Sequence, residues 1–143
     1  FIFSFNDESK INRILKDRMY VINTKGYNTK EKIKICNEYI IPELYDTYLF
    51  KRDEIIMTDE ILEYIISKYT CKEEGVRNLK RCIETIVSKI NIYNLSYDEE
   101  SKKAIDLTYQ IKDFKLPLEM NNDIIDSLLK TKKSDGPPTF MYM

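Results

Sequence analysis

The chain has 143 residues, of which 43% are hydrophobic and 33% are charged, as in a single soluble globular domain. Its 23 lysines and arginines balance 24 aspartates and glutamates, so no net charge attracts nucleic acid or anionic lipid. No segment approaches the roughly 20 apolar residues that cross a bilayer, so we expect no membrane span. With no histidine and three cysteines, we expect no metal site, and reduced thiols in an intracellular compartment.

Two apolar runs near the N-terminus predict strands. Residues 1–5 form a continuous aromatic and aliphatic run, and residues 19–23 form a second one. A run that is apolar throughout is typical of a strand buried on both faces of a sheet. A short helix or turn over residues 9–16 joins the two. Because two strands alone are not stable, we expect the rest of this α/β sheet to lie outside the chain.

After residue 26 the spacing of apolar residues changes to three and four, which predicts amphipathic helices. The first begins at Asn28, a favourable N-cap followed three residues later by Glu31. The second follows Thr58, the third covers about residues 75–94, and the fourth about residues 122–130. Their predicted core positions are Ile33, Cys36, Ile40, Ile41 and Leu44; Ile61, Leu62, Ile65, Ile66 and Tyr69; Val76, Leu79, Ile83, Ile86, Val87 and Ile90; and Ile124, Ile125, Leu128 and Leu129.

The remaining segments are shorter or more polar. Residues 95–113 predict a loop or a loose helix around 104–109. Residues 114–120 alternate apolar and polar side chains, and we expect them to pair with residues 55–57 as a small two-stranded element. The predicted fold is therefore mainly α, with four helices and a small two-stranded element, preceded by the last two strands of an α/β core.

The start of the third helix is a candidate anion site. Gly75 is a poor helix former, and Arg77 in a first turn opposes the helix macrodipole, so neither residue favours helix stability. Both fit if an anion, with phosphate as the leading candidate, binds the first amides and the guanidinium. The alternative is that Gly75 caps the preceding loop and Arg77 pairs with Glu73 or Glu74.

Two further polar residues interrupt the N-terminal apolar runs. Asn6 follows the first predicted strand, at the edge of an α/β sheet where ligands bind, and its amide could orient a water or contact a phosphate. Arg18 lies between the predicted helix and the second strand. The alternatives are that Asn6 only opens a turn and that Arg18 forms a surface ion pair worth about 0–1 kcal/mol.

Several motifs together resemble, in order and spacing, the ATPase module of Lon-type proteases. They are FIFSFN (1–6), LKDRM (15–19), GYNTKEK (26–32), YIIP (39–42), YT (69–70) and EGVRNL (74–79). The resemblance is closest over residues 1–94, weakens after about residue 95, and returns at residues 114–129. It implies an AAA+ fold, with residues 1–25 as the C-terminal end of the α/β core, residues 26–130 as the helical lid subdomain, and residues 131–143 as a C-terminal tail.

The resemblance also implies roles for individual residues. Asn6 would be sensor 1, which positions the attacking water, and Arg18 in the Asp-Arg-Met motif would be the arginine finger offered to a neighbouring subunit. Arg77 would be sensor 2, and Gly75 would let the phosphates approach. Tyr27 would lie at the hinge between the core and the lid, near the adenine. An amide and two guanidiniums suit phosphoryl transfer, which depends on positioning and charge stabilisation.

The implied cofactor is ATP with Mg²⁺, and the implied assembly is a ring homo-oligomer, expected to be a hexamer, that acts on proteins rather than nucleic acid. Family members usually carry prolines before the Asp-Arg-Met motif, where this chain has Asn12 and Arg13. If Met143 is the natural end, the chain resembles the protease-less Lon-like ATPases of giant DNA viruses. If the protein continues, a proteolytic domain with a Ser-Lys dyad is expected.

Two other functions remain open from the sequence. One is a degenerate AAA+ scaffold or adaptor without hydrolysis, and the other is a clamp-loader-like AAA+ protein acting on nucleic acid. The chain contains no Gly-rich phosphate loop of the Walker A type. We therefore expect the isolated chain to have no measurable ATPase activity.

Overall fold

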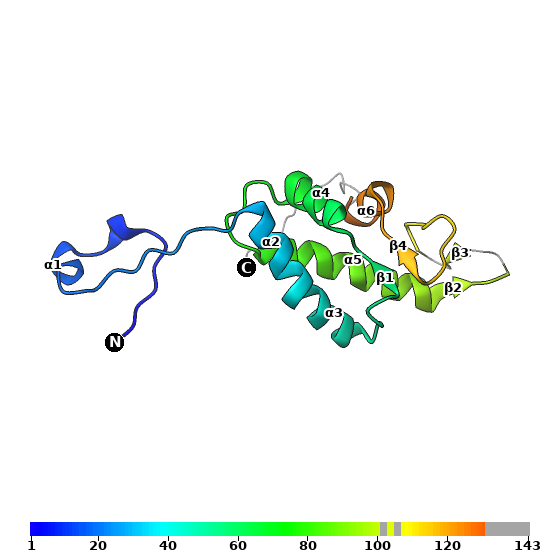
Figure 1. Ribbon diagram of the computed structural model, residues 1–143, viewed down its shortest axis with the longest axis horizontal. Coiled ribbons are helices and arrows are strands. Elements are labelled where there is room, and N and C mark those ends of the chain that lie inside the picture. Colours follow the sequence, from blue (N-terminus) through cyan, green and yellow to red (C-terminus); the bar gives the residue numbers. More distant parts are fainter. Residues whose placement is uncertain (101–102, 105–106, 131–143) are drawn as a thin grey trace, which may run out of the picture.

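The computed structural model describes residues 1–100, 103–104 and 107–130, so the expected tail at 131–143 lies outside the described residues. An N-terminal segment, residues 1–25, projects away from a helical body that begins near residue 26 (Figure 1). The segment contains a single 3₁₀ turn, η1 (Glu8–Lys10), and one short helix, α1 (Arg13–Lys16). The body contains the other helices and all the described strands.

The two strands predicted in the N-terminal segment are absent. Residues 1–5 and 19–23 have no strand partner among the described residues, and no residue from 1 to 25 is buried. A strand is stabilised by its ladder partners, so an apolar run without a neighbouring strand stays unpaired. The prediction of a short helical turn between the runs is correct, because η1 and α1 lie there.

The first helix of the body is continuous but not uniform. It consists of α2 (Thr29–Ile35), a π-helical turn η2 (Cys36–Ile40) and α3 (Ile41–Tyr48). Its predicted start is confirmed as a capping box, in which the Glu31 N–H donates to Asn28 Oδ1 and the Asn28 N–H donates to Glu31 Oε2, each at 2.9 Å. Because Pro42 has no N–H to donate, the helix widens just before it, and the Ile41 N–H reaches the Cys36 carbonyl.

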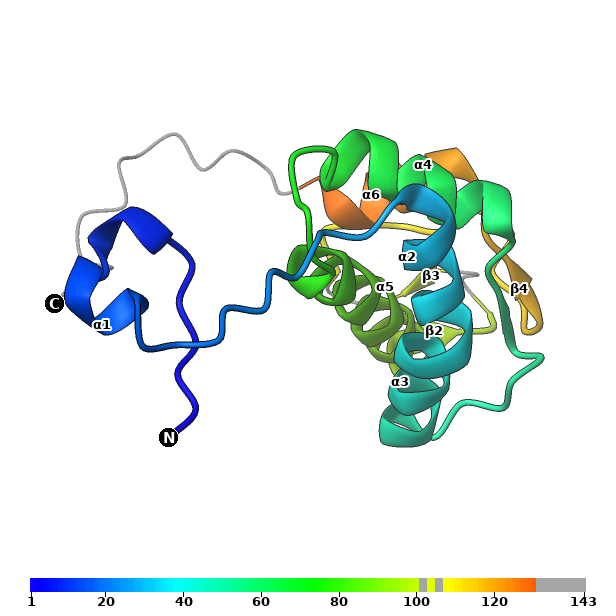
Figure 2. The ribbon, with the colours of Figure 1, turned by 60° about the vertical axis from the view of Figure 1, so that its left-hand side comes forward.

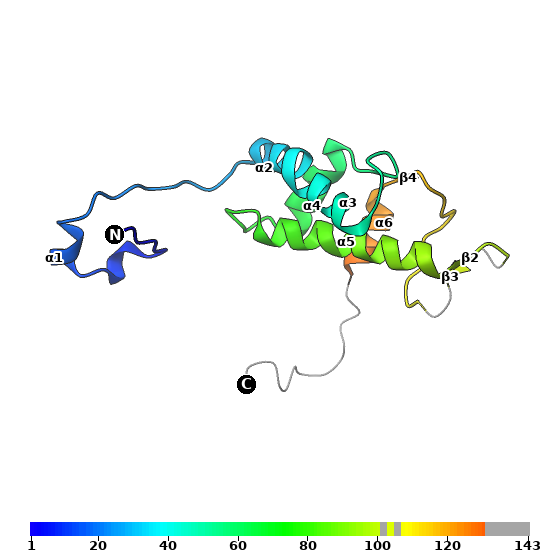
Figure 3. The same ribbon diagram turned by 90° about the horizontal axis from the view of Figure 1, so that it is seen from below.

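The other three predicted helices are also present. They are α4 (Asp59–Tyr69), α5 (Arg77–Ser96) and α6 (Asn122–Leu129). Helix α5 packs against α3, α4 and α6, and Figures 2 and 3 show it running along the body beneath α2 and α4. Most of the predicted apolar positions form the core. The fully buried ones include Cys36, Leu62, Ile65, Leu79, Ile83, Ile86, Val87, Ile90, Ile125 and Leu128.

Two small sheets join the helices. Strand β1 (Ile55–Ile56) pairs in parallel with β4 (Leu118–Glu119), which confirms the predicted two-stranded element. Strand β2 (Tyr97–Asp98) pairs antiparallel with β3 (Lys103–Ala104). Of the two alternatives for residues 95–113, the loose helix around 104–109 is wrong for its described residues, because residue 104 pairs as a strand and residues 107–109 are not helical. Residues 107–113 form a loop, as the other alternative predicted. The fold class, mainly α with a small two-stranded element, is as predicted.

A polar cluster holds α6 against α4. The Asp126 carboxylate accepts hydrogen bonds from Lys68 Nζ at 2.7 and 2.8 Å, from the Tyr69 hydroxyl at 2.6 Å and from the Tyr64 hydroxyl at 3.0 Å. The hydrogen bonds from Lys68 and Tyr69 lower the pKa of Asp126 to about 2. Burial, followed by the bond to Asp126, raises the pKa of Tyr69 to about 12. The cluster therefore favours an ionised Asp126 and a neutral Tyr69.

Candidate functional site

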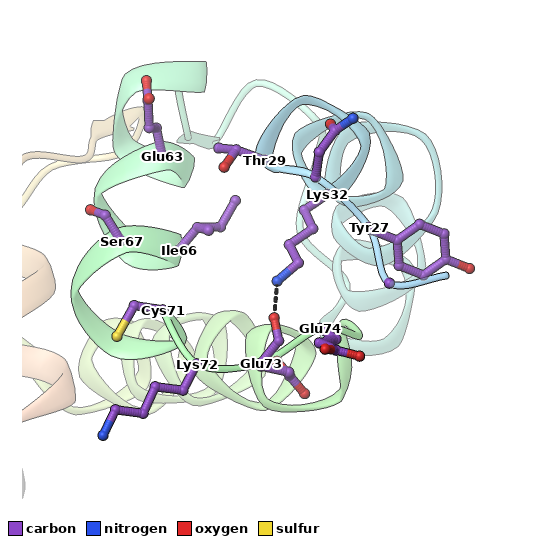
Figure 4. A pocket seen from close by; sticks show the side chains of 12 residues that line it. Tyr27, Thr29, Lys32, Glu63, Ile66, Ser67, Cys71, Lys72, Glu73 and Glu74 are labelled. Atoms are coloured by element: carbon purple, nitrogen blue, oxygen red, sulfur yellow. Dashed lines mark hydrogen bonds between the residues drawn. The ribbon is translucent and has the colours of Figure 1, made fainter. Parts of the chain in front are cut away.

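An open cavity of about 640 Å³ lies where the N-terminal segment meets the helical body (Figure 4). One wall is the chain entering α2, another is the face of α4, and the floor is the loop between α4 and α5. Polar and charged side chains share the lining with about as much apolar surface, so the cavity suits a ligand that has both polar and apolar parts. The lining residues are Gly26, Tyr27, Asn28, Thr29, Lys32, Glu63, Ile66, Ser67, Cys71, Lys72, Glu73 and Glu74.

The chain entering α2 is fixed to the loop before α5. The Tyr27 N–H donates to the Glu74 carbonyl at 2.9 Å. A Cβ at Gly26 would lie 2.7 Å from the Cβ of Glu74, closer than real side chains approach. Residue 26 must therefore be glycine for the two backbones to lie this close. The predicted hinge is thus attached to the segment that leads into Arg77.

A buried lysine makes a second connection between the same two elements. Lys32, on α2, is only 5% exposed, and its ammonium donates to the Glu73 carbonyl, as the dashed line in Figure 4 shows. Lysine is almost never this buried unless it has a partner. The hydrogen bond from the buried Lys32 ammonium therefore connects α2 to residue 73.

Glu73 also caps α5 with its side chain. Its carboxylate accepts from the Asn78 N–H at 2.7 Å and from the Leu79 N–H at 3.2 Å, and the N-cap residue Val76 makes no side-chain cap of its own. The sequence predicts an anion at this helix start, with phosphate as the leading candidate, whereas the anion at these two amides is the internal carboxylate of Glu73. A phosphate would have to use the Arg77 side chain rather than these two amides.

Arg77 and Gly75 lie beside this cap. Arg77 is exposed and forms no ion pair with any residue that the structure describes, so the predicted alternative of a pair with Glu73 or Glu74 is not seen. Gly75 has no positive φ, and an added Cβ would meet nothing within 4 Å. Neither backbone strain nor crowding within this chain therefore requires glycine at position 75.

The structure brings three of the five predicted site residues to one end of the body. Tyr27, Gly75 and Arg77 all lie at or next to the junction of the hinge with the α5 start, and the half-exposed Tyr27 ring points away from the cavity (Figure 4). Asn6 and Arg18 are not brought there. Both are exposed in the N-terminal segment, which Figure 1 shows apart from the helical body.

Sequence reasoning missed several residues at this junction. Lys32 stands in a run of polar residues and resembles a solvated lysine, and Glu73 was considered only as a partner for Arg77. Ser67 and Cys71 line the cavity without any pattern that indicates it. The one available signal was an acidic residue shortly before a helix that has no Ser, Thr, Asp or Asn at its N-cap.

The described residues show neither a metal cluster nor a membrane helix. No group of three or more cysteine, aspartate or glutamate side chains in the described ranges could hold a metal ion. Among the helices of the described part, none is long and apolar enough to cross a membrane. None of the three cysteines forms a disulfide: Cys36 is buried, Cys71 is exposed and Cys82 is half-buried.

Comparison with known proteins identifies the central part of the helical body. Residues 47–104 match the Lon protease AAA+ ATPase lid domain. A Lon protease homolog of Acanthamoeba polyphaga mimivirus is 47% identical over 91 residues, which is 64% of this chain and 9% of that protein. The Lon protease of Campylobacter concisus is 37% identical over 105 residues, or 73% of this chain and 13% of that protein. The mitochondrial Lon protease homolog of Caenorhabditis briggsae is 40% identical over 89 residues, or 62% of this chain and 9% of that protein.

The chain therefore spans about a tenth of the length of the curated relatives it matches. The resemblance expected from the motifs is confirmed, and the mainly helical body with its small parallel sheet agrees with it. The chain carries the lid domain of a Lon-type AAA+ ATPase module.

Proposed function

We propose that the chain is the sensor and lid portion of a Lon-like ATPase that couples ATP binding and hydrolysis to protein remodelling in a ring oligomer. The observation that carries the proposal is the junction of Gly26 and Tyr27 with the loop before α5, because it joins the hinge directly to the helix bearing Arg77. An exposed arginine without an ion-pair partner in the described residues is available to a phosphate.

In this proposal the cavity at the hinge faces the base and ribose of ATP, and Arg77 reaches the phosphates. ATP, bound with Mg²⁺, supplies the phosphoryl group. Arg77 would stabilise the charge on that group. The Tyr27 ring, which points away from the cavity in Figure 4, would have to turn toward it to lie near the adenine. The described residues supply no phosphate-binding loop. In this proposal the cavity would therefore contact only the side of the nucleotide that carries the base and ribose. The isolated chain is expected to bind nucleotide weakly at best.

Residues 1–25 would be the end of the α/β core of the module. Their apolar side chains support this assignment, because side chains this exposed are normally covered by another surface. Exposed examples are Phe1, Ile2, Phe3, Tyr20 and Ile22. In the completed module Asn6 would orient the attacking water, and Arg18 would face the nucleotide of the neighbouring subunit. We propose a ring homo-oligomer, expected to be a hexamer, that acts on protein substrates in a reducing intracellular compartment.

One observation favours a second candidate, an AAA+ scaffold without hydrolysis. The Glu73 carboxylate occupies two amides of the α5 start, which leaves fewer donors for a phosphate. Walker A and Walker B motifs in the sequence that precedes residue 1 would favour the enzyme, and their absence would favour the scaffold.

The ATPase rate of the full-length protein carrying Arg77→Ala tests whether the chain is part of an active ATPase. Loss of a group that stabilises transition-state charge lowers turnover by about 10²-fold or more. Arg18→Ala should lower it on the same order, and mixing it with wild-type subunits tests whether the arginine acts across a subunit interface. If turnover is unchanged in both variants, the chain is not the sensor portion of an active ATPase.

A further inference from the structure

Glu73 lies between the hinge and the helix that carries Arg77, and it contacts both. Its main-chain carbonyl accepts the ammonium of the buried Lys32 on α2. Its carboxylate accepts the N–H groups of Asn78 and Leu79 in the first turn of α5. A single residue therefore connects α2 to α5 through two different groups.

These contacts restrict how the first turn of α5 can move. A charged acceptor with two donors forms stronger hydrogen bonds than a neutral one, and Val76 offers no side-chain cap that could replace it. The Glu73 N–H also donates to the Thr70 carbonyl at 3.0 Å, which fixes the residue to the end of α4. Arg77 is the first residue of α5, so the direction of its side chain depends on this turn.

The hinge is attached at the next residue as well. The Tyr27 N–H donates to the Glu74 carbonyl, and Gly26 packs against the Glu74 side chain. The chain entering α2 and the interior of α2 are thus bound to two consecutive residues, 73 and 74. A displacement of the hinge relative to this loop would have to move the start of α5.

We propose that Glu73 and Lys32 are positioning residues for Arg77, which hold its guanidinium in the orientation that the reaction requires and link that orientation to the hinge. This inference rests on the proposed function, since it requires Arg77 to act on a phosphate. Both residues line the cavity, but the Lys32 ammonium and the Glu73 carboxylate are engaged with protein groups, so in this proposal they act through Arg77 rather than on the phosphates. Misplacing a charge-stabilising group by about 1 Å is enough to lower a rate substantially.

A double-mutant cycle on the ATPase activity of the full-length protein tests the inference. The four proteins are wild type, Glu73→Gln, Arg77→Ala and the double variant. We expect Glu73→Gln alone to lower kcat on the order of 10-fold. In the Arg77→Ala background the same change should lower kcat by less than about twofold, because the group being positioned is already absent.

This readout separates positioning from a purely structural role. If Glu73→Gln only reduced the fraction of folded protein, it would lower kcat by the same factor in both backgrounds. Equal factors, or no effect of Glu73→Gln in the wild-type background, would overturn the inference while leaving the role of Arg77 intact. Unchanged turnover in Arg77→Ala would overturn the role that the proposed function gives to Arg77, and the inference with it.

Lys32→Met provides a second route if Glu73→Gln melts at too low a temperature to assay. Lys32→Met removes the ammonium that donates to the Glu73 carbonyl. Like Glu73→Gln, it should lower kcat in the wild-type background and have little effect on kcat in the Arg77→Ala background. Matched controls are Glu84→Gln and Lys30→Met, which remove a charge from exposed positions of α5 and α2. Both controls should keep the wild-type kcat, and a loss equal to that of the test variants would count against a specific role for residues 32 and 73.

Discussion

Two regions of the chain, the N-terminal segment (residues 1–25) and the helical body (residues 26–130), contain similar apolar side chains. Only the body buries them. In the N-terminal segment no residue is buried, and Phe1, Ile2, Tyr20 and Ile22 are each more than three-quarters exposed. In the body, isoleucines of the same size, such as Ile83 and Ile86, are completely buried. An apolar run therefore favours burial, but it becomes buried only where a second surface covers it.

The largest expected difference between the two regions is in the free energy of unfolding that is lost when an isoleucine in each is changed to alanine. Ile83→Ala leaves a cavity in the core of the body and should reduce the free energy of unfolding by about 2–5 kcal/mol. Ile22→Ala removes the same atoms from an exposed position and should change it by less than about 0.5 kcal/mol. Urea denaturation of the 143-residue chain measures both. Equal losses would mean that residues 1–25 pack against a surface in solution.

The border between the regions offers a second comparison, between two glycines. Gly26→Ala forces a Cβ against Glu74 and should cost about 1–3 kcal/mol of stability, as overpacking does elsewhere. Gly75→Ala meets open space and should be neutral, or stabilising by up to about 1 kcal/mol. Hydrogen exchange at the Tyr27 amide should accelerate in the first variant only. Unchanged protection there would show that the hinge is not held by Glu74.

The sequence was sufficient for the parts of the fold that depend on local spacing. The stripe in residues 61–69 predicted α4, and Asn28 with Glu31 predicted the start of α2. The pairing of residues 55–57 with residues 114–120 was also predicted, from the apolar run of the first and the apolar–polar alternation of the second, and it is seen between residues 55–56 and 118–119. The strands at 1–5 and 19–23 could not be judged correctly, because strand formation depends on partners that a single run does not reveal.

The candidate site was predictable only in part, for a related reason. Gly75 and Arg77 were identifiable because neither residue type favours a helix start, although in the structure only Arg77 lies in α5 and Gly75 precedes its N-cap. Lys32 and Glu73 are good helix and loop residues by local rules, and their importance comes from a contact between positions 41 residues apart. The resemblance to the Lon family pointed to Tyr27 and Arg77 as candidate site residues. The contact of Lys32 with Glu73, which joins the elements that carry them, is visible only in the three-dimensional structure.

A smaller difference in stability is expected when one ion pair is broken in each region. Asp126→Asn removes a charge that accepts from Lys68, Tyr64 and Tyr69, and should cost about 1–2 kcal/mol. Glu8→Gln breaks the pair with Lys16 in the N-terminal segment, where both side chains are more than 40% exposed, and should not change the stability of the body. The denaturation experiment above measures both variants. A comparable loss in Glu8→Gln would again indicate that the segment is part of the folded unit.

The smallest expected effect is the pH dependence that follows from two lowered pKa values, one in each region. The pKa of Asp126 is about 2 in the folded body, below its ordinary value of 3.8, so its contribution to stability is complete above about pH 5 and is lost as the pH falls toward 2. Hydrogen bonds from Ser9 also lower the pKa of Asp7, but they stabilise only a local turn of the N-terminal segment.

Only the first of these shifts is linked to unfolding of the body. The difference in unfolding free energy between wild type and Asp126→Asn should therefore be constant from about pH 7 to pH 5 and shrink below pH 4. Asp7→Asn should leave the unfolding free energy unchanged over the same range. Urea titrations at several pH values distinguish the two. A pH-dependent effect of Asp7→Asn would mean that the turn at residues 7–10 folds together with the helical body, and the two regions would then form one cooperative unit.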